Sequence, residues 1–242
     1  MMVAPEVVSL GTAAHIGIRV RGIVDDLIAD LPAPKLYSPE SQQGVIARYS
    51  SVLEGNFIYW MTGAYLAAKS EEARSIIRDN LLEEVRDGHP GMLRRFAIAA
   101  NAVPNDGHAL AVWPALSKVQ GFIGRLSPLP IITMMAFFED FIQKFMPYLS
   151  ELATLQGSVE QQYTDVHRNC DGLHSIELFR ALGAELPLAS NSDKQSANLF
   201  EGIYLLRALI HAIVPVGQIR DEANRVPGKR KYSSFVTIHQ SR

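Results

Sequence analysis

Two histidines and an aspartate are spaced so that one face of a helix would carry all three side chains. His167, Asp171 and His174 stand at positions i, i+4 and i+7. At about 100° per residue, these offsets fall on one narrow stripe of an α-helix. Imidazole and carboxylate groups together make a good site for a divalent metal ion. We therefore interpret the stripe as half of a metal site; the alternative is a buried, hydrogen-bonded cluster.

The other half of such a site needs acidic side chains on otherwise apolar helix faces. Glu54 lies between Leu53 and Phe57, and Glu139 directly follows Phe138 in an apolar run. An ionised carboxylate is costly to bury unless it is paired, protonated or bound to a metal. Both glutamates are therefore candidate ligands. The alternative for each is a solvated or salt-bridged acid.

A third candidate stretch combines an acid pair with a histidine. Glu83 and Glu84 precede His89, and Gly88 and Pro90 flank that histidine. In a regular helix, residues five apart point about 140° away from each other, so they share a metal only if the helix is distorted near the glycine. Either glutamate of the pair is a candidate. The alternative is that Glu83 and Glu84 lie on a solvated helix face and that His89 lies in a loop.

Composition limits the class of protein. The chain has 242 residues, 48% of them hydrophobic and 20% charged, with a formal net charge of −2 and a single cysteine. Such a length predicts one domain, here taken as residues 1–242, and the balanced charge gives no reason to expect nucleic acid as a partner. No signal peptide is recognisable, and the longest apolar run, 129–138, is too short to span a membrane. We expect a cytoplasmic protein with no membrane contact.

Apolar residues recur at helical spacing along the chain, so we expect an all-α bundle of about seven helices. The motif-bearing core covers about residues 44–214, and a basic, flexible tail follows at about 222–242. We expect the run 129–138 to lie in a buried helix. We also expect Ser38 and Ser70 to cap the helices that follow them. One helix should begin near Pro114 after a loop at 104–107, another should end near Leu182, and the last should run from Ser190 to Val214.

Seven of these residues resemble the ligand set of the heme-oxygenase-like di-iron oxidases and oxygenases, also called the iron-containing redox enzyme family: Glu54, Glu84, His89, Glu139, His167, Asp171 and His174. The pattern His167-x-x-x-Asp171-x-x-His174 is the most specific part of the resemblance. The stretch from Asn80 to Phe96 is similar to another family motif, although fewer residues than usual separate its glutamate from its histidine. The resemblance covers about residues 44–185.

The resemblance implies a heme-oxygenase-like helical fold that holds two Fe(II) ions. Glu84 and His89 would bind one iron, and the histidines and aspartate of the stripe mainly the other. Glu54 and Glu139 would complete or bridge the pair. Because O₂ is the co-substrate in this family, the resemblance also implies an O₂-dependent oxidase or oxygenase.

The implied substrate is a small metabolite, most of all an amino acid, in secondary metabolism. A tryptophan-type amino acid converted to a nitrile is the sharpest expectation, and a homodimer is compatible with the resemblance. The alternatives are a di-iron fatty-acid or amine oxidase, or an enzyme of the same fold without iron ligands, similar to thiaminase or pyrroloquinoline-quinone synthase. A heme oxygenase would need His15 as its axial ligand. A helical binding or scaffold protein remains as a non-enzymatic alternative.

Overall fold

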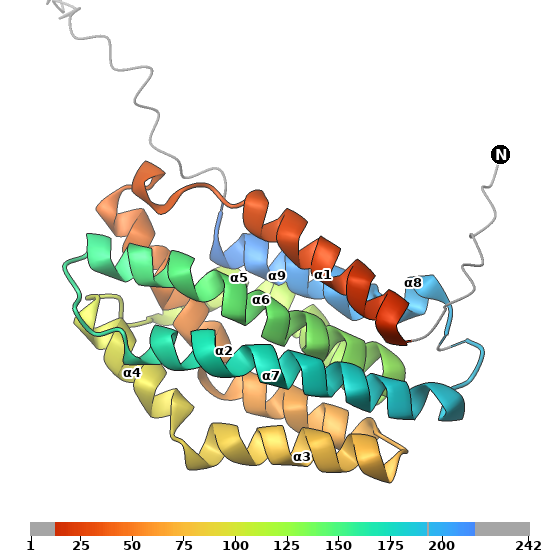
Figure 1. Cartoon of the computed structure of the whole chain (residues 1–242). Coiled ribbons are helices and arrows are strands. Elements are labelled where there is room, and N and C mark those ends of the chain that lie inside the picture. The colour runs from red at the N-terminus through yellow and green to blue at the C-terminus, as the bar shows by residue number, and fades with distance from the viewer. Residues whose placement is uncertain (1–12, 193, 216–242) are drawn as a thin grey trace, which may run out of the picture.

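The periodic apolar pattern forms helices throughout the part of the chain that the structure describes (Figure 1). The computed structural model describes residues 13–192 and 194–215, except for the side chains at positions 169–171, 196 and 197. Within these residues the helices are α1 (Ala13–Ala29), α2 (Pro39–Ala67), α3 (Glu71–Arg86), α4 (His89–Ala99), α5 (Asp106–Ile123), α6 (Pro128–Leu155), α7 (Gln162–Glu185), α8 (Ser196–Leu199) and α9 (Glu201–Ile213). The 3-10 turns Pro34–Leu36 and Leu186–Leu188 complete the set, and the described residues contain no strand. The all-α class is confirmed. The count of nine helices corrects the expected number of about seven, and the tail expected at about 222–242 lies outside the described residues.

The start of α5 differs from the expectation because its N-terminal cap lies in the supposed loop. The Asn105 side chain accepts a hydrogen bond from the backbone N–H of His108, and the His108 ring accepts one from the backbone N–H of Asn105. This reciprocal pair satisfies donors that the first helical turn otherwise leaves free. The helix therefore begins at Asp106, and Pro114 lies inside it.

The last part of the chain also folds differently from its pattern. The helix α7 continues through Gly183 to Glu185. The run expected as one helix from Ser190 to Val214 is divided into α8 and α9 at Phe200, whose backbone (φ −98°, ψ 0°) is not helical. Phe200 is fully buried. We attribute the division to the packing of that side chain, which overrides the local periodicity.

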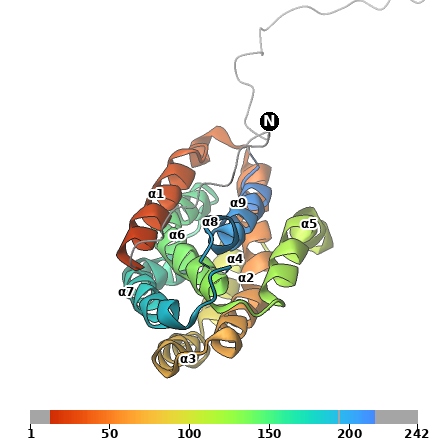
Figure 2. The same cartoon turned by 90° about the vertical axis from the view of Figure 1, so that its right-hand side faces the viewer.

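Helix α6 lies in the centre of the bundle, with α1, α2, α7 and α9 packed around it (Figure 2). All residues from Pro128 to Ile142 are buried, which confirms the expected buried helix. A helix that is apolar all round has to be covered on every side. Glu139 stands in this helix and thus enters the core with it. None of the described helices has the length and apolar character needed to cross a membrane.

Helices α2, α3 and α4 carry the breaks that shape the site. Ser38 and Ser70 cap α2 and α3 as their sequences predict, each accepting a hydrogen bond from a backbone N–H three residues later. Helix α2 is interrupted at Glu54 and Gly55, and Gly55 has φ +86°. A positive φ of this size is easy for glycine and strained for other residues. The interruption divides α2 beside the cavity described below.

Candidate metal centre

A helix break brings Glu84 and His89 together. Gly88, at φ +70° and ψ 31°, separates the end of α3 from the start of α4 in a left-handed conformation. Across this break the Nδ1 atom of His89 lies 2.9 Å from the Oε1 atom of Glu84. Both side chains are buried, with 5% of each residue exposed. The distortion near Gly88 on which a shared site depends is therefore present.

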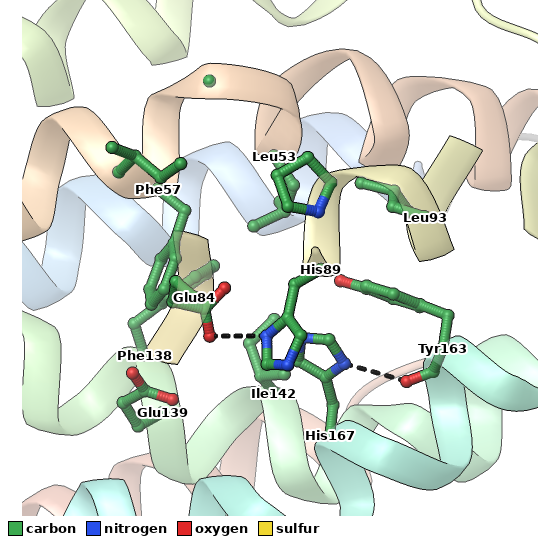
Figure 3. A pocket seen from close by; sticks show the side chains of 13 residues that line it. Leu53, Phe57, Glu84, His89, Leu93, Phe138, Glu139, Ile142, Tyr163 and His167 are labelled. Atoms are coloured by element: carbon green, nitrogen blue, oxygen red, sulfur yellow. Dashed lines mark hydrogen bonds and ion pairs between the residues drawn. The ribbon is translucent and has the colours of Figure 1, made fainter. Parts of the chain in front are cut away.

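His167 joins this pair from α7, and its ring lies next to the ring of His89 (Figure 3). One ligand atom each from Glu84, His89 and His167 can be chosen so that all three lie within 4.8 Å of one another. The two imidazole rings have their centroids 4.5 Å apart. Three potential donors at such separations can bind one ion between them. This group is buried and comes from three different helices.

The ring of His167 is held in the orientation that a metal ligand needs. Its Nδ1 atom lies 2.8 Å from the backbone oxygen of Tyr163, one helical turn earlier, and donates a hydrogen bond to it. That bond fixes the proton on Nδ1 and leaves the lone pair of Nε2 for a metal. Burial lowers the pKa of His167 to about 4, so the ring is neutral near pH 7. A neutral imidazole is the form that ligates metals.

The pKa of His89 is shifted in the opposite direction to that of His167. Burial alone would lower the pKa of His89, but the Glu84 carboxylate, with Asp87 and Glu83, raises it above its ordinary value. Without a metal, Glu84 therefore favours a protonated His89 beside it. The Nδ1 atom nevertheless has no aligned hydrogen-bond partner, although Glu84 is within ion-pair distance. A cation in the group would take the place of the proton and satisfy this nitrogen, so the residues present fit a metal.

The group forms one wall of a cavity of about 40 Å³. This is room for roughly three water molecules, or for ions with some of their waters. Glu139 lies on the same wall, and most of the remainder is apolar, formed by Leu53, Phe57, Ile58, Leu93, Phe138 and Ile142. Gly55 and Pro90, which are exposed, also line the cavity and mark its opening to solvent.

A second polar cluster lies next to the first. The Nε2 atom of His174 is 2.9 Å from the Oε2 atom of Glu83, and its Nδ1 atom is 3.9 Å from the Oε2 atom of Glu139. The Nδ1 atom is buried and has no hydrogen-bond partner. Glu139 thus lines the cavity of the first group and also lies near His174. Two carboxylates and an imidazole are again a suitable donor set for a divalent ion.

The structure divides the predicted stripe between these two clusters. His167 groups with Glu84 and His89, whereas His174 lies near Glu83 and Glu139. At 1.5 Å of rise per residue, seven residues separate the two histidines by about 10 Å along the helix, and the two rings accordingly have different neighbours. Asp171 belongs to α7 between them, and its side chain lies outside the described residues.

Glu54 does not join either cluster in this structure. It stands at the interruption of α2, where its side chain is 44% exposed and forms an ion pair with Arg94 of α4. Its neighbours Leu53 and Gly55 line the cavity instead. The alternative heme ligand His15 is exposed near the start of α1 and does not line the cavity.

Two groups that shape the candidate metal centre are not marked by any pattern in the sequence. The Tyr163 carbonyl orients His167, but every helical residue presents a backbone oxygen to the residue four positions on, so nothing marks this one. The sequence presents Glu83 only as an alternative to Glu84, whereas in the structure Glu84 lies beside His89 and Glu83 beside His174.

Comparison of the chain with protein-family models, curated proteins and solved structures finds no match.

Proposed function

We propose that the protein is a non-heme di-iron oxidase or oxygenase that uses O₂. The observation that carries the proposal is the buried group Glu84, His89 and His167, in which two imidazoles and one carboxylate converge beside a cavity. This donor type, with open coordination positions, is characteristic of non-heme Fe(II) enzymes that activate O₂. These three residues would hold one iron. Bound Fe(II) would supply the electrons with which O₂ is reduced.

The second iron would be held by Glu139 and His174, with Asp171 as a further ligand and with Glu83 orienting the His174 ring. Support comes from the 3.9 Å distance between His174 Nδ1 and Glu139 Oε2 and from the unsatisfied His174 Nδ1 atom. Glu139 also lines the cavity beside Glu84, His89 and His167, and it would complete or bridge the iron pair. Glu54 would contribute only after leaving Arg94, with which it is paired at the surface.

We propose that the substrate is a small metabolite, most of all an amino acid, with a tryptophan-type amino acid as the first to test and a nitrile as its product. Most of the cavity wall is apolar, and the rings of Phe57 and Phe138, whose centroids are 5.7 Å apart, would contact an apolar side chain. Because the cavity has room for roughly three water molecules, a tryptophan-type substrate would require it to widen. The chain's own residues would bind and orient this molecule and exclude water from the reacting atoms. Oxidation of a fatty acid or amine on the same centre remains the alternative.

The decisive experiment is metal analysis after reconstitution with Fe(II) under anaerobic conditions. We expect about two irons per chain in the parent protein and a loss of at least one in His167→Ala. A matched control is His15→Ala, which removes an exposed histidine outside the cavity and should bind as much iron as the parent. No iron uptake by the parent protein would rule the proposal out. Consumption of a fatty acid, but of no amino acid, by the loaded protein and O₂ would overturn the substrate class alone.

A second candidate function is a mononuclear iron oxygenase. It is favoured by the fact that only Glu84, His89 and His167, among the described residues, form a group tight enough to surround one ion. The same metal analysis separates the two candidates. One iron per chain that is retained in His174→Ala indicates the mononuclear enzyme. Two irons, with one lost in His174→Ala, indicate the di-iron enzyme.

A further inference from the structure

A second, smaller cavity lies directly beside the metal-site cavity. Helices α2, α6 and α9 enclose it, and its volume is about 10 Å³. Leu53 and Phe138 line both cavities, so these two side chains form a shared wall. Tyr49 of the small cavity and Tyr163 of the large one meet through their hydroxyl groups, 2.7 Å apart. We refer to the smaller space as the apolar void.

The size of the apolar void restricts what it can hold. A cavity needs roughly 10–15 Å³ on this measure to hold one water molecule, so the void holds one particle of about that size. An amino-acid side chain or an alkyl chain does not fit without a rearrangement of the core. The candidates are a single water molecule and a small gas molecule.

The lining decides between these candidates. The wall consists of aliphatic and aromatic groups such as Val52, Leu206 and Ile210, and it exposes no polar atom. The hydroxyl of Tyr49 is engaged with Tyr163. A buried water molecule needs two to four polar partners, and apolar cavities stay dry and take apolar ligands instead. The lining therefore favours an apolar molecule over water. A diatomic gas is somewhat longer than a water molecule and would bind with a small outward movement of the wall.

We propose that the apolar void binds O₂ and passes it to the metal-site cavity by way of Leu53. This inference rests on the proposed function, because a protein that uses no O₂ has no need of such a store. Leu53 is half-buried and is the last residue before the non-helical step at Glu54 and Gly55. A rotation of its side chain connects the two cavities, since it stands in the wall of both.

Because dissolved O₂ is paramagnetic, methyl NMR tests the void without any turnover. Metal-free protein labelled at Ile, Leu and Val methyl groups is measured under O₂ and under N₂ at equal pressure. The methyl groups of Val52, Leu206 and Ile210 should relax faster under O₂ than those of Val24 and Leu27, which are equally buried but lie outside both cavities. Equal enhancement at the two sets of methyl groups would overturn the proposal.

Two substitutions on α9 sharpen the test. Leu206→Phe fills the void and should abolish the enhancement, whereas Leu205→Phe makes the same change at a neighbouring position outside the void and should preserve it. If Leu206→Phe does not fold, Val52→Ile adds a methylene to the wall that α2 contributes and should reduce the enhancement. An enhancement that persists in the folded filled variant overturns the assignment to this void.

The KM for O₂ of the iron-loaded enzyme provides a second test. We expect Leu206→Phe to raise the KM for O₂ while leaving kcat and the iron content close to those of Leu205→Phe. An unchanged KM for O₂ in a variant that has lost the methyl enhancement would overturn the delivery role. A protein that shows the enhancement but takes up no iron would instead refute the proposed function, so the two failures are distinguishable.

Discussion

The Nδ1 atom of His89 lies 2.9 Å from the Oε1 atom of Glu84 because Gly88 adopts a left-handed conformation between them. In an unbroken helix these two side chains would point about 140° apart. The glycine therefore brings together two side chains that a regular helix would keep apart, and they form two of the three members of a buried donor group. His167 completes that group from another helix.

Replacing Gly88 with alanine should damage both stability and metal binding. A Cβ atom at Gly88 would meet no other atom within 4 Å, so the cost is that of the backbone conformation, about 1 kcal/mol. Relaxation of this strain would move His89 away from Glu84 and lower iron uptake. The control Gly22→Ala lies inside α1 with open space around it and should stabilise the protein slightly. Urea unfolding and metal analysis check both variants; unchanged values in Gly88→Ala would contradict the role of the break.

The two neighbouring glutamates of α3 should respond differently to substitution. Glu84→Gln removes a carboxylate of the tight group and should abolish binding of one iron. Glu83→Gln changes the half-exposed partner of His174 and should leave the iron at the Glu84 position in place. Because Glu83 would orient His174, Glu83→Gln should lower the affinity at the second position by about 10- to 100-fold. Titration with Fe(II) separates the two effects, and the reverse order of sensitivity would exchange the roles of the two glutamates.

Metal binding should stabilise the folded protein. A ligand that binds only the folded state at about 100 times its Kd adds about 2.7 kcal/mol to the free energy of unfolding. We expect Zn(II), which accepts the same ligands without redox chemistry, to raise the Tm of the parent protein. His167→Ala should show a smaller shift, and His15→Ala the full shift. A Tm that Zn(II) and Fe(II) both leave unchanged would contradict the assignment of a metal site.

Glu185 should matter for stability but not for metal binding. It is fully buried at the end of α7, where its carboxylate accepts hydrogen bonds from the backbone N–H groups of Lys69 (3.0 and 3.1 Å) and Ser70 (2.9 Å). Charge-assisted bonds of this kind contribute about 1.5–3 kcal/mol each, so Glu185→Ala should lower the free energy of unfolding by about 3 kcal/mol. Glu151→Ala, at an exposed position on α6, is the matched control. Urea unfolding measures both, and iron uptake should be equal in the two variants.

Much of the fold follows from local signals in the sequence. The apolar periodicity, the caps at Ser38 and Ser70 and the buried run at 129–138 predict their helices correctly, because each depends on interactions within a few residues. The start of α5 and the division at Phe200 were missed. The first depends on an uncommon histidine in a capping box, and the second on packing between distant segments.

The sequence alone determined which side chains are candidates for the metal centre and that they belong to helices. Spacing placed His167 and His174 on one face of α7, and the apolar surroundings of Glu139 indicated that this acid is buried. Spacing along one helix, however, does not say which residues of other helices stand opposite each turn. Only the tertiary structure decided that His167 faces Glu84 and His89, that His174 lies near Glu83 and Glu139, and that Glu54 turns to the surface. The reason is that the breaks at Gly88 and Gly55 and the packing of α3, α4 and α7 set these neighbours.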